Sequence, residues 1–232
     1  RRIADGMSFV NSANKLTDMA SLCKELLVYQ NKDLKVDMYI QRVTELDKNT
    51  LNWALDLAEK NMKKLYETCA WGWNKERKVE EMTDDNAWYL ICKAKSGTLL
   101  AFSHFRFDMD FGEPVLYCYE VQVELEGRRR GLGQRVLQVL EQLARSTHMH
   151  YVRLTALTHN PAAAAFFKTL KALFFVNKEL RACAPRDSLH CDNFYRKALS
   201  SQPLKYVKIK FRKADKSRLK THEQNACSGS LG

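Results

Sequence analysis

The stretch LYCYEVQVELEGRRRGLGQR, from Leu116 to Arg135, decides the fold. Its first half alternates as a β-strand does, with one face formed by Tyr117, Tyr119, Val121 and Val123 and the other by Cys118, Glu120, Gln122 and Glu124. We therefore expect Glu120 in the middle of a strand, among aromatic side chains. The second half is a turn that opens a helix, because apolar residues recur after it at helical spacing, at Leu132, Val136, Val139, Leu140 and Leu143.

The turn RRRGLG, residues 128–133, combines three arginines with two glycines. Glycine lets backbone amides approach a ligand closely, and the free amides at the start of a helix attract anions. The chain contains neither the Walker pattern nor the G-x-G-x-x-G dinucleotide pattern. The turn therefore predicts an anion-binding loop of another kind, with an ordinary basic turn as the alternative.

Length and composition suit one domain with tails, since the chain has 232 residues and 45% of them are hydrophobic. No run is long enough to span a membrane. The chain begins without Met and without a charged-then-apolar leader, so we expect a fragment with no secretory signal. Seven scattered cysteines without a C-x-x-C pair favour a reducing intracellular compartment. The spacing of Cys183, His190 and Cys191 fits no common zinc site, so we expect no metal.

The net charge of +11 is unevenly distributed. Residues 201–232 hold eight Lys or Arg against two acidic residues, whereas residues 105–126 hold six acidic residues against one arginine. The basic tail is expected to be a flexible, solvated extension, and an import signal or a nucleic-acid-contacting arm are the alternatives. Within it, YVKIKFRK alternates in a way that also suits an added strand. The acidic stripe lies beside the presumed active strand.

Periodicity and turn signals predict the elements in order. Strands are expected at 36–43, 87–95, 99–108, 115–124, 151–158, 173–177 and 194–199. Helices are expected within 3–29, at 50–68, 131–148 and 162–170, with a charged loop at 74–85. This order predicts an α/β (α+β) fold with a twisted, mixed, mostly antiparallel sheet of about seven strands flanked by helices. We expect a helical segment at 1–30, one domain at 31–200 and the tail at 201–232.

The loop resembles the acyl-CoA loop of the GCN5-related N-acetyltransferase (GNAT) superfamily, whose pattern [RQ]-x-x-G-x-[GA] is matched by Arg128, Gly131 and Gly133. Longer strings resemble its NatD branch of histone N-terminal acetyltransferases: YETCAWGW, EEMTDDNAWYLI, AFSHFRFD, VLYCYEVQ and LTALTHN. The resemblance implies a sheet splayed between strands four and five. It also implies acetyl transfer from acetyl-CoA to the α-amine of histone four and histone two-A, which begin Ser-Gly-Arg-Gly.

The resemblance implies a role for each matching residue. An α-amine must lose a proton before it attacks a thioester, and Glu120 is implied as the general base, with Tyr119 beside it. Implied acetyl-CoA contacts are Val121, Gln122, Val123, Arg128, Arg129, Arg130, Gly131, Leu132, Gly133 and Asn160. Implied substrate contacts are Tyr66, Trp71, Asp108, Asp110, Tyr117, Tyr119, Thr155 and Tyr195.

Each residue also has a plainer interpretation. Glu120 can be a strand carboxylate that faces solvent or pairs with an arginine, the acidic pair can be solvated turn residues, and Asn160 can be only a helix cap. Two other functions stay open, namely acetylation of lysine side chains or small amines, and non-catalytic binding of acyl-CoA or nucleic acid. A histone enzyme implies the cytoplasm and nucleus, histone N-terminal peptides as partners and no membrane, with ribosome association open.

Overall fold

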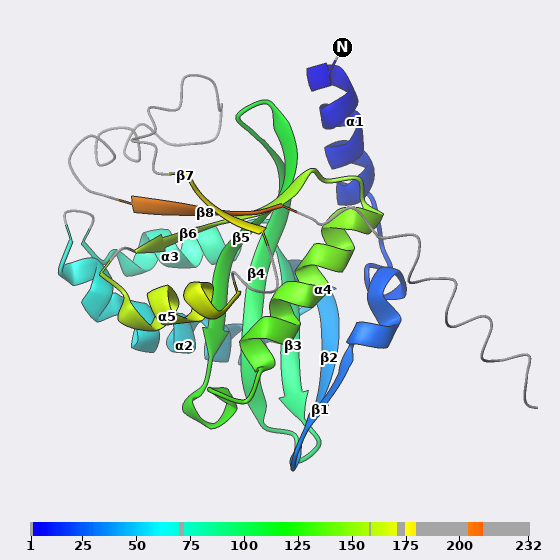
Figure 1. Cartoon of the computed structure of the whole chain (residues 1–232). Coiled ribbons are helices and arrows are strands. Elements are labelled where there is room, and N and C mark those ends of the chain that lie inside the picture. Colours follow the sequence, from blue (N-terminus) through cyan, green and yellow to red (C-terminus); the bar gives the residue numbers. More distant parts are fainter. Residues whose placement is uncertain (1, 70–71, 158, 171–174, 180–203, 211–232) are drawn as a thin grey trace, which may run out of the picture.

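The computed structural model describes residues 2–69, 72–157, 159–170, 175–179 and 204–210 (Figure 1). Several predictions therefore lie outside the described residues. They are the substrate contacts Trp71 and Tyr195, the strand at 194–199, and the set Cys183, His190 and Cys191.

One mixed sheet organises the described chain. It has eight strands in the order β1-β2-β3-β4-β5-β6-β8-β7. Their bounds are β1 Val28–Asn31, β2 Leu34–Arg42, β3 Trp88–Ala94, β4 Leu99–Asp110, β5 Glu113–Val123, β6 Tyr151–Leu157, β7 Phe175–Glu179 and β8 Leu204–Lys210. All neighbours are antiparallel except β5 and β6, which are parallel. The predicted fold class is confirmed, with one strand more than the expected seven.

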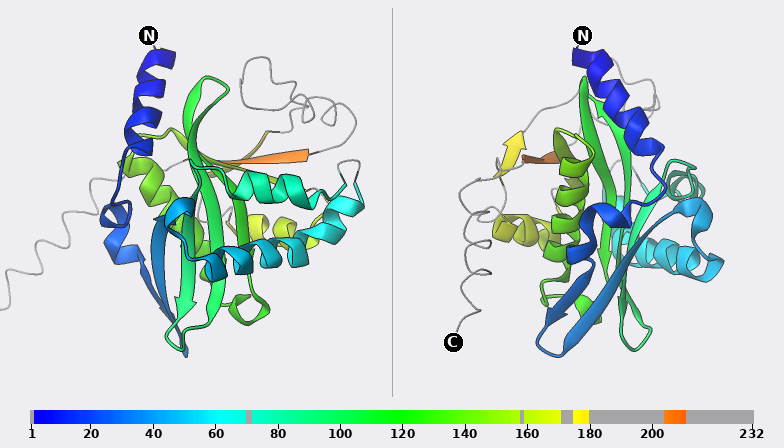
Figure 2. Two further views of the ribbon diagram at one scale, coloured as in Figure 1. Left: turned by 180° about the vertical axis from the view of Figure 1, so that it is seen from behind. Right: turned by 90° about the vertical axis from the view of Figure 1, so that its right-hand side faces the viewer.

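Helices cover both faces of this sheet. They are α1 Arg2–Asn14, α2 Lys48–Glu67, α3 Lys75–Met82, α4 Leu132–Ser146 and α5 Pro161–Leu170, with short 3-10 turns η1 Ala20–Leu26, η2 Val43–Glu45 and η3 Leu125–Gly127. Figure 2 shows α4 and α5 on one side of the sheet and α2 and α3 on the other. Among the described helices, none is long and apolar enough to cross a membrane.

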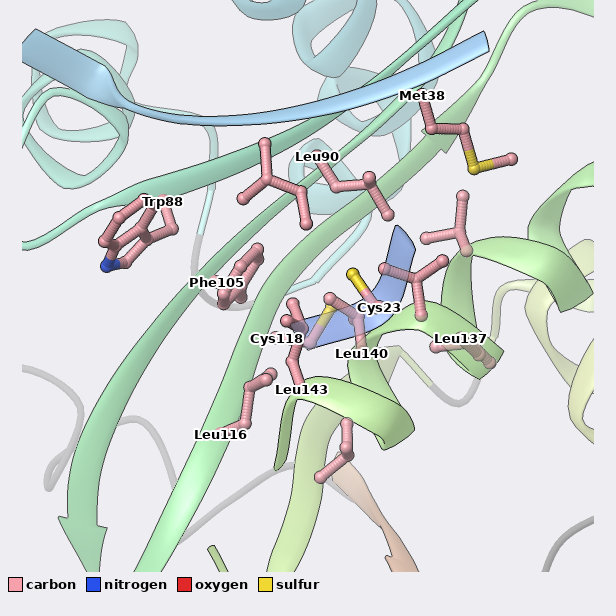
Figure 3. Close-up of a cluster of buried hydrophobic side chains, with 14 of the residues drawn as sticks. Cys23, Met38, Trp88, Leu90, Phe105, Leu116, Cys118, Leu137, Leu140 and Leu143 are labelled. Atoms are coloured by element: carbon pink, nitrogen blue, oxygen red, sulfur yellow. The ribbon is translucent and has the colours of Figure 1, made fainter. Parts of the chain in front are cut away.

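Each face has its own hydrophobic core. Under α4, strand residues such as Leu116 and Cys118 meet Leu140 and Leu143 of the helix (Figure 3). Under α2 and α3, a second cluster is formed by buried residues that include Ala54, Leu57, Met82, Tyr89 and Phe102. The two clusters share the sheet as their common wall, so each strand must present a suitable side chain to either side.

Two sequence predictions were wrong. Val28–Asn31 is not helical but pairs with β2 as a short edge strand. The expected charged loop at 74–85 contains α3, because the Asn74 side chain caps the helix by accepting from the Arg77 amide at 2.8 Å and Met82 is buried beneath it. For the stretch YVKIKFRK in the tail, the alternative of an added strand is the one that the structure shows, because Leu204–Lys210 is strand β8. It lies between β6 and β7, where it completes the hydrogen bonding of the β6 edge.

The parallel pair β5 and β6 separates partway along its length. Its register runs only from Val115 opposite Tyr151 to Cys118 opposite Leu154. Beyond that point β5 continues to Val123 and β6 continues to Leu157, but the two strands no longer pair with each other. The splay predicted between the fourth and fifth expected strands is therefore confirmed, and it leaves one backbone edge of β5 open.

Candidate active site

A β-bulge at Tyr119 sets the geometry of the site. Cys118 lies opposite Phe105 and Glu120 lies opposite His104, so Tyr119 is an extra residue without a partner on β4. Such an insertion reverses the facing of every later residue in the strand.

The predicted faces of β5 were therefore wrong beyond the bulge. Val121 and Val123 pack against the α4 core together with Cys118. Glu120 and Gln122 turn instead toward α3 and α2, where they bond Lys78 and Asn61. The bulge thus brings the carboxylate to the same side of the sheet as Tyr117, whose ring lies 4.8 Å from that of Tyr119.

Glu120 is only 4% exposed and both of its oxygens are engaged. Its Oε1 lies 2.9 Å from Nζ of Lys78, and its Oε2 accepts from Nε2 of Gln122 at 2.7 Å. The same Nζ of Lys78 also forms an ion pair with Oε1 of Glu81, at 2.6 Å. Burial lowers the pKa of Lys78, but the charges of Glu120 and Glu81 outweigh it and raise that pKa well above its usual value. Glu120 is therefore neither solvent-facing nor paired with an arginine.

Aromatic and cationic groups surround this carboxylate. The His104 ring stacks between Tyr89, at 5.4 Å, and Tyr119, at 4.9 Å. Burial, together with the nearby charges of Arg106 and Lys78, holds the pKa of His104 well below its usual value. His104 is therefore a neutral imidazole at physiological pH, and it forms a fixed wall against which the Tyr119 ring is held.

The splay is bridged by a hydrogen bond between two of the predicted substrate residues. The hydroxyls of Tyr117 on β5 and Thr155 on β6 lie 2.6 Å apart. Tyr66, at the end of α2, has Nζ of Lys78 5.6 Å from its ring centroid, so it also belongs to this side of the site. A pocket of about 280 Å³ lies between α2 and α3, and Trp73 and Lys78 form part of its wall.

The predicted acidic pair is divided. Asp110 forms an ion pair with the buried Arg153 of β6, which also donates to the Asp110 carbonyl at 2.9 Å. Asp108 is exposed, and its Oδ1 accepts from the amide of Met109 at 2.7 Å. The two carboxylates therefore do not form one shared acceptor for a guanidinium group.

The glycine loop is held from the N-terminal part of the chain. Gly131 begins α4 in the left-handed region, at φ of 79°. The Tyr29 hydroxyl and the Asn31 amide both donate to the carbonyl of Arg130, at 2.7 and 2.9 Å. A Cβ at Gly131 would lie 2.3 Å from the Tyr29 oxygen, so both the backbone angle and the packing require glycine here.

Two predicted acetyl-CoA contacts have structural partners of their own. Arg128 donates from Nε to the Val123 carbonyl at 3.0 Å and from its guanidinium to Oδ1 of Asn61 at 2.8 Å. Asn160 caps α5, since its Oδ1 accepts from the Ala163 amide at 3.1 Å. Asn160 is therefore a helix cap, and its contact with acetyl-CoA stays a prediction.

The remaining geometry fits an acyl-CoA. The first turn of α4 leaves backbone amides without helical partners, and Gly131 gives a phosphate close access to them. The open edge of β5 beyond Cys118 offers strand amides to the pantetheine arm. Within the described ranges, no group of three metal-binding side chains gathers in one place.

Sequence reasoning missed the partners of Glu120. Lys78 and Glu81 fell in the expected loop, although Asn74 as a cap and the Lys78 to Glu81 spacing are helix signals. Asn61 carried no signal, because a polar residue on a helix is ordinarily a solvated one.

Comparison with known proteins agrees with this geometry. The sequence model of the acetyltransferase (GNAT) family matches residues 50–171, which run from α2 through the glycine loop and past α5. An acetyltransferase from Streptococcus agalactiae superposes with a TM-score of 0.52 and 11% identity, over 75% of this chain and 98% of that one.

Two other solved structures are similar at lower scores. The PaiA N-acetyltransferase from Thermoplasma acidophilum, in complex with coenzyme A, has a TM-score of 0.48 and 12% identity over 75% of this chain and 99% of that one. Nourseothricin acetyltransferase has a TM-score of 0.38 and 14% identity, over 54% of this chain and 65% of that one. Because the family model covers more than half of its length, this chain belongs to the GNAT family of acetyltransferases, which take their acetyl group from acetyl-CoA.

Proposed function

We propose that this protein acetylates the free N-terminal α-amine of histone four and histone two-A. The observation that carries the proposal is the buried Glu120 carboxylate, which the Tyr119 bulge turns to the α2 and α3 side of the sheet beside the splay. The resemblance of the strings around Trp73, Glu120 and Thr155 to the NatD branch supports the choice of amine. The partners would be histone N-termini, met in the cytoplasm and the nucleus.

The chemistry requires a base for an amine whose pKa is about 7.7 to 8.0. Glu120 would take the proton as the amine nitrogen forms its bond to the acetyl carbon and the carbon–sulfur bond breaks. Both oxygens of Glu120 already accept one hydrogen bond each, and a carboxylate oxygen can accept a second. The carboxylate can therefore receive the amine, directly or through one water, without losing its supports.

The surroundings of Glu120 suit a small first residue. Tyr117, Tyr119 and Tyr66 place three aromatic rings around the carboxylate and Lys78. A Ser-Gly start carries little side-chain volume and fits such a wall, whereas a large first side chain would meet it. For an arginine in the third position, Asp108 is the exposed acceptor, because the carboxylate of Asp110 already holds Arg153.

Mass spectrometry of synthetic peptides tests the proposal. The protein is incubated with acetyl-CoA and Ser-Gly-Arg-Gly-Lys, with its N-terminus either free or blocked. Acetyl is expected on the free terminus alone. Acetyl on lysine in both peptides would favour instead the side-chain or small-amine reaction, which the acidic stripe at residues 105–126 also suits. Absence of product from both peptides would contradict either amine reaction.

A further inference from the structure

A continuous chain of hydrogen bonds joins Glu120 to the glycine loop. Nε2 of Gln122 donates to Glu120 at 2.7 Å, and Nδ2 of Asn61 donates to Oε1 of Gln122 at 3.0 Å. The guanidinium of Arg128 donates in turn to Oδ1 of Asn61 at 2.8 Å. Three elements are linked in this way: the loop, helix α2 and strand β5.

Every bond in this chain points in the same direction. Arg128 can only donate, and the ionised carboxylate of Glu120 can only accept. The two amides between them each accept with oxygen and donate with nitrogen. Neither amide can turn over without setting oxygen against oxygen or nitrogen against nitrogen, so the two ends fix the orientation of both. Hydrogen bonds aligned in this way also polarise one another.

The position of Gln122 makes this chain the lateral support of the carboxylate. Gln122 is 6% exposed and follows Glu120 on the same face of β5, directly after the bulge. Lys78 holds the other oxygen of Glu120 from α3. The carboxylate is therefore held directly by Lys78 of α3 and by Gln122, which Asn61 of α2 supports. Rotation about the last bond of the Glu120 side chain would break one of the two direct contacts.

We propose that Gln122 and Asn61 are positioning residues for Glu120, and that Arg128 anchors them to the acetyl-CoA loop. This inference rests on the proposed role of Glu120 as the base. Neither amide touches the reacting atoms. They hold the carboxylate aimed at the amine, and they make its orientation depend on the conformation of the loop that is predicted to bind acetyl-CoA.

Three variants test the chain through kcat and its pH dependence. Gln122→Ala removes the donor to Glu120, and kcat is expected to fall about tenfold, since misplacement by about 1 Å costs up to about a hundredfold. Gln122→Glu sets a second carboxylate beside Glu120, and the acidic limb of the pH profile of kcat/KM is expected to move up by about one unit. A change confined to folding would leave that limb in place.

Asn61→Asp is the sharpest variant. Aspartate still accepts from Arg128 but offers no donor to Gln122, whose amide is then expected to turn its oxygen toward Glu120. The contact between α2 and the loop is kept, now as an ion pair in place of the hydrogen bond from Arg128 to Asn61, while kcat is expected to fall at least as far as in Gln122→Ala. Lys60→Met is the matched control, because Lys60 precedes Asn61 on α2 and makes only an exposed ion pair with Glu124. Its kcat should stay within twofold of the parent protein.

Failure of the chain and failure of the base assignment give different results. If Glu120→Gln keeps full activity, the base assignment fails and the inference falls with it. If Glu120→Gln is inactive while Gln122→Ala and Asn61→Asp keep the parent kcat and Gln122→Glu the parent acidic limb, the base stands and the chain is overturned. The expected falls in kcat of Gln122→Ala and Asn61→Asp, together with the shifted acidic limb of Gln122→Glu and with folded protein verified by circular dichroism, support the inference.

Discussion

The two faces of β5 differ in what they bury. Toward α4 the strand presents Cys118, Val121 and Val123 to a hydrophobic core without buried charges among its described residues. Toward α2 and α3 it presents Glu120 and Gln122 to buried charges and amides. Burial of apolar area is favourable on its own, whereas a buried charge must be paired and hydrogen-bonded. One face of the strand therefore supplies stability, and the other holds the proposed base at a cost that its partners offset.

The largest expected effect is on the chemical face. Glu120→Gln keeps the shape of the side chain and removes its ability to take a proton. We expect kcat to fall about 10²- to 10⁴-fold, the usual contribution of general base catalysis. Product formation with the free Ser-Gly-Arg-Gly-Lys peptide measures kcat, and calorimetry measures acetyl-CoA affinity, which should not change. An unaltered kcat would show that the amine loses its proton elsewhere.

Removal of the lysine from the same face should lower stability. Lys78→Met leaves the buried carboxylate of Glu120 without its cation and takes the same cation from the half-buried Glu81, and we expect a loss of about 3 to 5 kcal/mol in the free energy of unfolding at pH 7. Urea denaturation measures it. The double variant Lys78→Met with Glu120→Gln should be more stable than Lys78→Met alone, because one unpaired charge is gone. Equal stability of the two variants would contradict the ion pair.

The pH dependence of this pair follows from the raised pKa of Lys78. A lysine whose pKa is higher in the folded state stabilises the fold fully below its ordinary pKa of 10.5. That stabilisation is lost only as the pH rises through the higher folded value. Lys78 should therefore keep its charge toward Glu120 as the pH is raised through the alkaline part of the range in which activity is measured.

The apolar face should respond in stability alone. Leu140 is a fully buried residue on the inner face of α4. It belongs to the same hydrophobic cluster as Leu116 and Cys118 of β5 (Figure 3). Leu140→Ala should lower the free energy of unfolding by about 2 to 5 kcal/mol, through lost burial and a cavity. At a temperature where the variant is folded, kcat should match that of the parent protein. A large fall in kcat would show that the two faces are coupled through the strand.

The smallest expected effect concerns acid sensitivity. His104 has a folded pKa well below 6.5, so below pH 6.5 the unfolded chain binds a proton that the folded protein does not. As the pH is lowered below 6.5, His104 should therefore reduce the free energy of unfolding by up to about 1.4 kcal/mol for each pH unit. In His104→Phe, which keeps a ring between Tyr89 and Tyr119, that share of the slope should vanish. Denaturation at pH 5.0, 5.5, 6.0 and 6.5 measures the slope, and identical slopes would refute the assignment.

Much of the fold could be predicted because it follows from periodicity. Strands β3 and β4, helix α4 and the glycine loop lie close to their expected bounds. The bulge could not be predicted, since an inserted residue leaves the alternation of YCYEVQV looking unbroken. Only the register with β4 reveals that Tyr119 has no partner. The faces of Glu120 and of everything after it changed for that reason.

The site was predicted in part for a similar reason. The resemblance identified Glu120 and the loop, but Lys78, Asn61 and Arg153 acquire their roles from neighbours that are far apart in the sequence. Asp110 illustrates the difference. In the sequence it is an acidic residue beside another, whereas in the fold it is the partner of a buried arginine on β6. Such pairings depend on topology, and no local pattern encodes them.

The bonds from Tyr29 and Asn31 to Arg130 have a consequence for the order of folding. They join segments 101 and 99 residues apart, so the glycine loop acquires its support only after a long chain closure. During synthesis, strand β1 emerges first and must wait for the loop. The glycine loop is thus completed late, and the acetyl-CoA binding that we predict there should require a fully assembled molecule rather than a folded fragment of it.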